Sequence, residues 1–281
     1  MLSVLEIVQK TTAFFSSKGV ESPRLNAEIL IGHALGLKRM QLYLQFERML
    51  TEAELDQIRP LVRRRGHREP LAYVVGETDF HGLRLKTDRR ALVPRPETEG
   101  LVELVVKACV PPPARILDLG TGSGCSALAF AQAFPEAQVT AVDASEEALA
   151  LARENAAVTG LAARVQFARS DWYGALPAGA KYDAIVANPP YLTPAETAET
   201  QPEVRAFEPV LALTADEEGL AALRVIVAGV SAHLAPGGLL ALETGIAHHA
   251  RVLELLETAG LRERSSHRDL AGRDRYVLAR L

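Results

Sequence analysis

The segment Asn188-Pro189-Pro190-Tyr191 has residue types that could hold and activate a planar amino group. Asn188 can accept one N–H of an NH2 group through its side-chain oxygen, and the backbone carbonyl of Pro189 can accept the other. The two prolines fix the backbone and remove two N–H donors, while Tyr191 can lie flat against a planar group. An NH2 conjugated to a carbonyl or an aromatic ring is a poor nucleophile, and hydrogen bonds that hold its hydrogens out of plane localise the lone pair. The alternative is an ordinary turn, because Asn-Pro pairs mark turns generally.

A glycine-rich loop, Asp118-Leu119-Gly120-Thr121-Gly122-Ser123-Gly124, follows an expected strand at 115–119 and opens an expected helix at 126–134. Glycines let the backbone turn sharply and approach a ligand closely. The loop is not a P-loop, and Cys125 stands where a dinucleotide-binding GxGxxG loop would need glycine. Its spacing resembles the D/E-x-G-x-G-x-G loop of S-adenosylmethionine-dependent methyltransferases; a purely structural glycine turn is the alternative. We expect cofactor contacts from Gly120, Thr121, Gly122, Ser123 and Gly124.

Acidic residues also end the next two expected strands. Asp143 follows the strand at 138–142 and can accept hydrogen bonds from both hydroxyls of a ribose. Asp171 and Trp172 follow the strand at 164–168 and suit an adenine, with a polar group for the amine and a flat face for the ring. The alternatives are that Asp143 is only an acid at a helix N-terminus and that Trp172 is a core residue. Taken together, the three strand ends indicate a site for a nucleoside-containing cofactor.

These motifs need a parallel sheet to bring them together. Beyond residue 114, strands alternate with helices, which predicts an α/β domain whose sheet is covered by helices on both faces. Ligands in such sheets bind at the carboxyl ends of the strands, where every motif above falls. Before this domain, about the first 70 residues predict short helices, including one that a capping box begins at Thr51, and a β-hairpin is expected within 77–93. The remaining expected elements are strands at 182–187, 238–243, 261–267 and 275–281 and helices at 97–109, 145–158, 217–234 and 247–259.

The distribution of charge limits the classes of partner. Residues 1–92 carry 15 Lys/Arg and 11 Asp/Glu, whereas residues 93–281 carry 16 Lys/Arg and 24 Asp/Glu. An acidic larger part argues against a broad nucleic-acid surface. The basic run at 63–68 is interpreted as a solvated helix end, with contact to an acidic partner as the alternative.

Other sequence features argue against secretion, membrane insertion and metal chemistry. We expect no signal peptide and no membrane span, and a cytoplasmic location. The two cysteines form no metal-ligand pattern, so we expect no metal. We interpret His248 and His249 as surface residues.

The chain resembles the bacterial protein-(glutamine-N5) methyltransferases that modify peptide chain release factors. The motifs that carry this resemblance are REPLAY at 68–73, Gly76, LVPRPETE at 92–99, the loop 118–124, Asp143, SDW at 170–172, NPPY at 188–191, FEP at 207–209 and GRDR at 272–275. NPPY alone also occurs in adenine and cytosine amino-methyltransferases, and its combination with PRPETE is much more specific. The resemblance covers nearly the whole chain.

The resemblance implies a substrate and a domain arrangement. It implies an N-terminal helical substrate-recognition domain at 1–75, a β-hairpin linker at 76–93 and a Rossmann-like, seven-stranded class I methyltransferase domain at 94–281. S-adenosyl-L-methionine would contact residues 120–124, Asp143, Asp171, Trp172 and Asn188. The glutamine of a release factor Gly-Gly-Gln motif would enter the cleft at Asn188, Pro189, Pro190 and Tyr191, of which Asn188, Pro189 and Tyr191 are the expected catalytic residues. We expect the chain to act as a monomer.

Other functions compete with this one. Glutamine methylation of a ribosomal protein stays open, because related enzymes share the cleft. Amino-methylation of a nucleic-acid base is less favoured, since the acidic catalytic part has no appended target-recognition domain. A nicotinamide-dependent oxidoreductase and an inactive binding module are weakened by Cys125 and by the intact NPPY segment, respectively.

Overall fold

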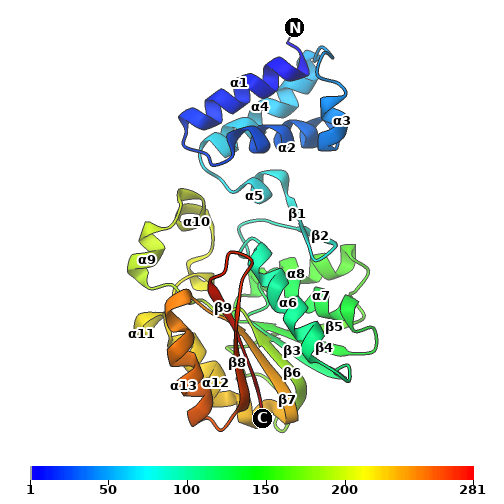
Figure 1. Cartoon of the computed structure of the whole chain (residues 1–281). Coiled ribbons are helices and arrows are strands. Elements are labelled where there is room, and N and C mark those ends of the chain that lie inside the picture. Colours follow the sequence, from blue (N-terminus) through cyan, green and yellow to red (C-terminus); the bar gives the residue numbers. More distant parts are fainter. Residues whose placement is uncertain (1) are drawn as a thin grey trace. The chain divides into compact units, whose positions relative to one another are not determined.

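Short helices form the first part of the chain, as predicted, in the computed structural model of residues 2–281 (Figure 1). These helices are α1 (Val4–Ser17), α2 (Pro23–Leu35), α3 (Arg39–Tyr43), α4 (Glu52–Gly66) and α5 (Leu71–Val75). Along α1, the buried residues Val4, Val8 and Phe15 recur at helical spacing, so one face packs into a core. Thr51 begins α4 with the predicted capping box, in which its hydroxyl accepts from the Glu54 amide and the Glu54 carboxylate accepts from the Thr51 amide.

The basic run at 63–68 is not simply a solvated helix end. Arg65 is only 5% exposed and pairs with Glu203 at 2.9 Å, and Arg68 pairs with the other oxygen of the same carboxylate at 2.6 Å. Glu203 lies on α10 (Pro202–Phe207), and residues 201–207 form one compact unit with the residues up to 77. The solvated interpretation is therefore wrong for Arg65, which holds a segment more than a hundred positions away in sequence.

The second unit, residues 78–200 and 208–281, contains the predicted sheet. Its seven strands have the order β5-β4-β3-β6-β7-β9-β8, and the strand β9 is antiparallel to both of its neighbours. The strands are β3 (Arg115–Leu119), β4 (Gln138–Asp143), β5 (Val165–Arg169), β6 (Tyr182–Ala187), β7 (Leu234–Glu243), β8 (Arg262–Arg268) and β9 (Asp274–Arg280). The predicted Rossmann-like, seven-stranded α/β class is confirmed.

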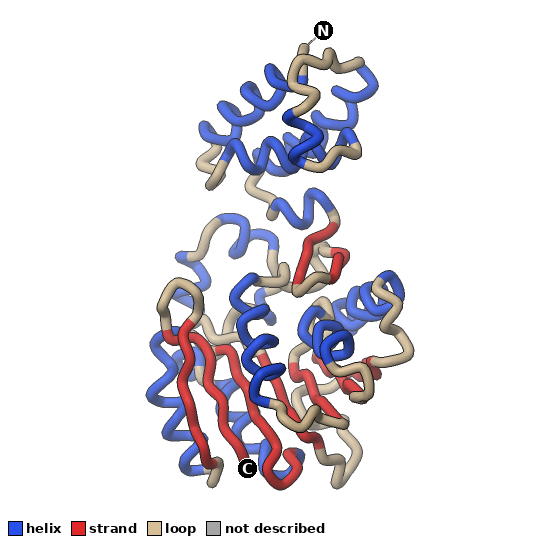
Figure 2. Tube along the Cα trace, turned by 45° about the vertical axis from the view of Figure 1, so that its right-hand side comes forward, coloured by secondary structure: helices blue, strands red, loops and turns tan. Residues whose placement is uncertain are grey.

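Helices cover both faces of this sheet (Figure 2). Successive residues of a strand point to opposite faces, and Ile116 of β3 accordingly packs with one hydrophobic cluster while Leu117 packs with the other. The first cluster includes residues of α6 (Pro96–Ala108) and α7 (Cys125–Ala133), and the second includes residues of α12 (Ala221–His233) and α13 (His249–Thr258). The helix α8 (Glu146–Val158) follows β4.

The predicted hairpin is present as β1 (Glu77–Phe80) and β2 (Leu83–Lys86). His81 and Gly82, between the two strands, both have positive φ, as the central residues of a type I′ hairpin turn require. One helix begins later than predicted. Glu217 and Glu218 have φ of 54° and 57°, so the helix expected from 217 starts only at the first residue of α12. Within residues 2–281, no helix is both long and apolar enough to span a membrane.

The strand order places the two main motifs side by side. From β3 the chain builds outward through β4 and β5, then returns to the other side of β3 with β6. Leu119 at the end of β3 pairs with Ala187 at the end of β6, so the glycine loop and Asn188 leave adjacent strands at the same edge. A crevice at such a switch point is where open α/β sheets bind ligands.

Candidate active site

The glycine loop turns sharply between β3 and α7. Gly120, Gly122 and Gly124 all have positive φ, a conformation that side chains with a Cβ rarely adopt. A Cβ on Gly124 would also lie 3.1 Å from the Cβ of Ala152, so glycine permits close packing against α8. The amides of Gly120 and Thr121 both donate to the Val142 carbonyl, which fixes the loop to the end of β4.

Two carboxylates stabilise the glycine loop by accepting hydrogen bonds from it. Asp118 is buried, which raises its pKa to about 6, and it accepts a hydrogen bond of 2.6 Å from the Thr121 hydroxyl. Asp143 accepts from the Gly122 amide through one oxygen and from the Ser145 amide through the other, both at 2.8 Å. Burial also raises the pKa of Asp143. Because each carboxylate oxygen has two lone pairs, Asp143 keeps acceptor capacity after both of these bonds.

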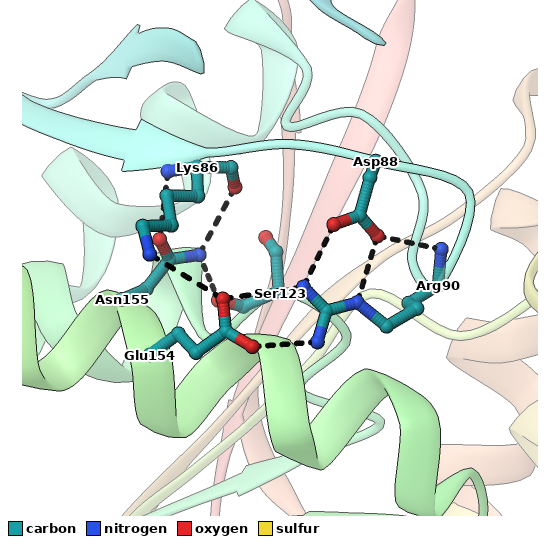
Figure 3. Close-up of polar contacts among 6 residues, drawn as sticks. All are labelled: Lys86, Asp88, Arg90, Ser123, Glu154 and Asn155. Carbon is teal, nitrogen blue, oxygen red and sulfur yellow. Dashed lines mark hydrogen bonds and ion pairs between the residues drawn. The ribbon is translucent and has the colours of Figure 1, made fainter. Parts of the chain in front are cut away.

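A third support comes from α8 (Figure 3). The Asn155 amide donates to the Ser123 carbonyl at 2.9 Å and exchanges two hydrogen bonds with the backbone of Lys86. Beside it, Arg90 is clamped between Asp88 and Glu154 at 2.7 Å from each. The glycine loop and the segment after the hairpin are thus anchored to the same helix.

These elements surround a cavity of about 470 Å³, within the range of small-molecule sites. Its lining includes Gly120, Thr121, Gly122, Ser123, Asp143, Asp171, Trp172, Asn188 and Pro190 among the predicted site residues. Residues 89–95 and several residues between 209 and 225 also line it. The Trp172 ring lies against the loop, because a Cβ on Gly120 would be 3.6 Å from it. Trp172 also packs with one of the two core clusters, whereas Asp171 is exposed.

Asn188 is held through its amide nitrogen. Its Nδ2 donates to the Thr98 hydroxyl at 3.0 Å, and that hydroxyl donates to Oε2 of Glu243 at 2.8 Å. Thr98 and Glu243 are both buried, and burial raises the pKa of Glu243 to about 7. Asn188 itself is only half-buried and lines the cavity.

Tyr191 is fixed on a different set of neighbours. Its hydroxyl lies 3.2 Å from Nη1 of Arg275, which donates to it. A Cβ on Gly245 would lie 3.1 Å from its ring, and a Cβ on Gly219 would collide with its carbonyl oxygen. Tyr191 is therefore closely packed, and burial raises the pKa of its hydroxyl.

The sequence matches known proteins in both of its parts. Residues 6–76 match the PrmC N-terminal domain family, and residues 98–204 match the methyltransferase small domain family. The release factor glutamine methyltransferase of Deinococcus radiodurans is 43% identical over 283 residues, covering 99% of each chain. That of Chlorobaculum tepidum is 42% identical over 263 residues, covering 90% of this chain and 89% of the relative. The chain belongs to the release factor glutamine methyltransferase family. It is a methyltransferase, and the predicted resemblance is confirmed.

Solved structures agree with the methyltransferase fold of this family. The hMettl16 catalytic domain in complex with MAT2A 3′UTR hairpin 6 has a TM-score of 0.59 and 17% identity, covering 78% of this chain and 81% of that one. The T. thermophilus 16S rRNA N2 G1207 methyltransferase in complex with AdoMet and guanosine has a TM-score of 0.52 and 20% identity, covering 73% and 49%. At this identity the similarity concerns the fold alone.

Three predicted site residues are not part of the cavity lining itself, although two of them, Pro189 and Tyr191, adjoin the lining residues Asn188 and Pro190 in the chain. Gly124, Pro189 and Tyr191 are not among the residues that line the cavity. Sequence reasoning also missed two residues that hydrogen bonds connect to Asn188, Thr98 directly and Glu243 through Thr98. Thr98 lies inside the PRPETE segment, where the resemblance signalled importance without a role, and Glu243 had no signal beyond its position at a strand end.

The interpretation of two histidines as surface residues is wrong. His248 and His249 are 9% and 6% exposed. Nε2 of His248 donates to the Glu218 carbonyl, and Nδ1 of His249 bonds to the Ser266 hydroxyl, both at 2.9 Å. Burial lowers the pKa of His249. Both residues therefore support the structure around β8 and the start of α12.

Proposed function

We propose that the chain transfers the methyl group of S-adenosyl-L-methionine to the side-chain amide nitrogen of the glutamine in the Gly-Gly-Gln motif of peptide chain release factors. The observation that carries this proposal is the orientation of Asn188. One N–H of its NH2 group donates to Thr98, which turns the nitrogen toward Thr98 and leaves its oxygen to accept a hydrogen bond at the cavity wall. The relatives named above as release factor glutamine methyltransferases support the same substrate. Since release factors act in translation, we place the reaction in the cytoplasm.

The residues around the cavity fit the proposed cofactor. Asp143 keeps acceptor sites for two ribose hydroxyls, and the Trp172 ring offers a flat face to an adenine. The positive-φ glycines bring the backbone close to the ligand without side chains in the way. When bound, the cofactor supplies an electrophilic sulfonium methyl group. Gly120, Thr121, Gly122, Ser123 and Gly124 would hold it together with Asp143, Asp171, Trp172 and Asn188.

The chain would activate the substrate amide by hydrogen bonding. The Asn188 oxygen would accept one hydrogen of the glutamine NH2 and the Pro189 carbonyl the other. Pro190 and Tyr191 would confine the planar amide from the side. Holding both hydrogens out of plane localises the nitrogen lone pair, and the bonds strengthen as the nitrogen gains positive charge.

We further propose that the first unit recognises the body of the protein substrate. Residues 1–77, its main segment, carry 11 Lys/Arg and 9 Asp/Glu, a small basic excess that supports contact with an acidic surface. Part of that excess is already used internally, because Arg65 and Arg68 bind Glu203. Arg63, on the same helix, is exposed and remains available for such a contact.

The rival substrates are a ribosomal-protein glutamine and a nucleic-acid base. The two solved structures described above contain an RNA hairpin and a guanosine, so the fold itself accommodates base substrates. The charge of residues 93–281, with 24 Asp/Glu against 16 Lys/Arg, disfavours a polyanion on this chain.

The test offers labelled cofactor with four acceptors: a release factor, the same factor with the motif glutamine changed to alanine, a glutamine-bearing ribosomal protein, and RNA. We expect label only in the unchanged release factor, with a weak dependence on salt. A nucleic-acid substrate that makes several phosphate contacts would lose affinity by orders of magnitude between low and moderate salt. Label in RNA with such a slope, or preferential label in the ribosomal protein, would overturn the proposed substrate.

A further inference from the structure

A buried three-residue chain of hydrogen bonds ends at the substrate-facing side chain. It runs from Glu243, at the end of β7, through Thr98, in the first turn of α6, to Asn188 beyond β6. Thr98 and Glu243 are 3% and 2% exposed. Three elements distant in sequence thus converge behind a single amide, and neither Thr98 nor Glu243 is among the contacts described for cofactor or glutamine above.

The direction of these bonds follows from counting protons. A hydroxyl has one proton, and an ionised carboxylate can only accept. Once Thr98 donates to Glu243, its oxygen can only accept from Asn188, so the amide must turn its nitrogen toward Thr98. The Asn188 oxygen then has to face the cavity, the orientation required to accept a hydrogen from a substrate NH2.

We propose that Thr98 and Glu243 are positioning residues that fix the orientation of the Asn188 amide and so make its oxygen the acceptor for the substrate amide. This rests on the proposed function. Without the hydroxyl of Thr98, either orientation of the Asn188 amide is available. One of the two orientations would place the Asn188 NH2 opposite the substrate NH2, and two NH2 groups of this kind cannot form a hydrogen bond with each other.

The charge of Glu243 also contributes to fixing the orientation of the Asn188 amide. Glu243 interacts electrostatically with five charged or titratable groups: Arg95, Glu97, Tyr191, Arg275 and Tyr276. Burial outweighs the neighbouring arginines and raises the pKa of Glu243 to about 7. A protonated Glu243 can donate to Thr98, which frees the Thr98 proton to bond with the Asn188 oxygen. Turnover should therefore fall as the pH drops below about 7.

The kinetic test compares Thr98→Val, Thr98→Ser and the control Thr244→Val. Thr244 is fully buried next to Glu243 in sequence, and its hydroxyl has no hydrogen-bond partner among the described residues. Thr98→Val should lower kcat by ~10–100-fold, somewhat less than loss of a direct transition-state contact. Cofactor Kd should stay within about threefold, because the Asp143 contacts are untouched. Thr98→Ser and Thr244→Val should stay close to the unchanged protein. A Thr98→Val protein with unchanged kcat, or a Thr98→Ser protein as slow as Thr98→Val, would overturn the proposal.

A second readout needs no substrate. The chain contains three asparagines, Asn26, Asn155 and Asn188, so labelling with 15N-asparagine gives three side-chain NH2 signals. Thr98→Val should shift the Asn188 signal and speed its exchange with solvent, while the other two stay unchanged and Thr98→Ser restores the original signal. An unmoved Asn188 signal would overturn the positioning role. This arm decides the question even if the unchanged protein fails to methylate glutamine, an outcome that would refute only the proposed function.

The pH arm isolates Glu243. In the unchanged protein, kcat should rise with pH between about 6 and 8, whereas Glu243→Gln should have a lower kcat that no longer depends on pH in this range. The Gln side chain fills the same space but can present either an acceptor or a donor to Thr98. Identical pH profiles for the two proteins would show that Glu243 does not set the amide orientation.

Discussion

Replacing Asp143 by alanine should weaken cofactor binding and destabilise the fold, and the two effects can be separated. The carboxylate makes two backbone bonds of 2.8 Å, to the amides of Gly122 and Ser145. Leaving these two part-buried amides without an acceptor costs ~1–3 kcal/mol each where water cannot replace the bond. The proposed bonds from two ribose hydroxyls to a charged acceptor are worth ~1.5–3 kcal/mol each, before the cost of desolvating Asp143.

The net effect on binding should be about 2–4 kcal/mol, a rise in Kd of ~30–1,000-fold. Isothermal titration calorimetry with S-adenosylmethionine measures this directly, and thermal unfolding measures the accompanying loss of stability. Ser145→Ala is the matched control, because the Ser145 hydroxyl caps α8 by accepting from the Ala148 amide. It should lower stability by ~0.5–2 kcal/mol and leave Kd nearly unchanged. If Asp143→Ala bound the cofactor like the unchanged protein, or if Ser145→Ala lost as much affinity, Asp143 would not be a ribose contact.

Substitutions at three further residues test the supports of the site. Asn155→Ala removes the bond to the Ser123 carbonyl and two bonds to the hairpin segment. Urea unfolding should show a loss of stability of ~2–4 kcal/mol, and the cofactor Kd should rise. An unchanged cofactor Kd would show that Asn155 does not position the glycine loop for binding. In the folded protein the pKa of Glu243 is raised from 4.5 to about 7, so its carboxyl stabilises the fold below pH 4.5 and this contribution is lost as the pH rises through 7. Glu243→Gln should lack this slope and be more stable than the unchanged protein at pH 8 by ~1–3 kcal/mol, and equal slopes would contradict the assigned burial effect. Tyr191→Phe should be mild, losing only the bond from Arg275, whereas Tyr191→Ala should slow turnover because the ring face confines the substrate; equal losses of kcat would assign the role to the hydroxyl.

Motifs at strand ends were predictable because a parallel sheet brings the carboxyl ends of its strands to one edge. The loop glycines, Asp143 and Asn188 could therefore be placed together from spacing alone, and the cavity lining includes most of them. The orientation of the Asn188 amide could not be predicted. It depends on Thr98, 90 positions away, and on Glu243, and no local pattern specifies which hydroxyl a half-buried amide meets.

Interpretations based on polarity failed where tertiary contacts outweigh it. Arg65 stands in a run of basic residues that suggests solvent exposure, yet Glu203 neutralises it in a buried position. His248 and His249 are polar enough for a surface turn, but inside the fold one ring nitrogen of each forms a hydrogen bond, to the carbonyl of Glu218 and to the Ser266 hydroxyl, respectively. The late start of α12 has a local cause, because Glu217 and Glu218 before it have left-handed backbone conformations. Their residue type does not require that conformation, so the sequence did not predict it.

The most direct test of the proposed function is to identify the atom that receives the methyl group. A release factor incubated with this chain and deuterated-methyl cofactor would be digested and fragmented in a mass spectrometer, with the Asn188→Ala protein measured in parallel. We expect one added methyl group on the side-chain nitrogen of the Gly-Gly-Gln glutamine, formed at least ~100-fold more slowly by the Asn188→Ala protein. A methyl group on any other residue or atom, or equal rates for the two proteins, would contradict amide methylation at Asn188.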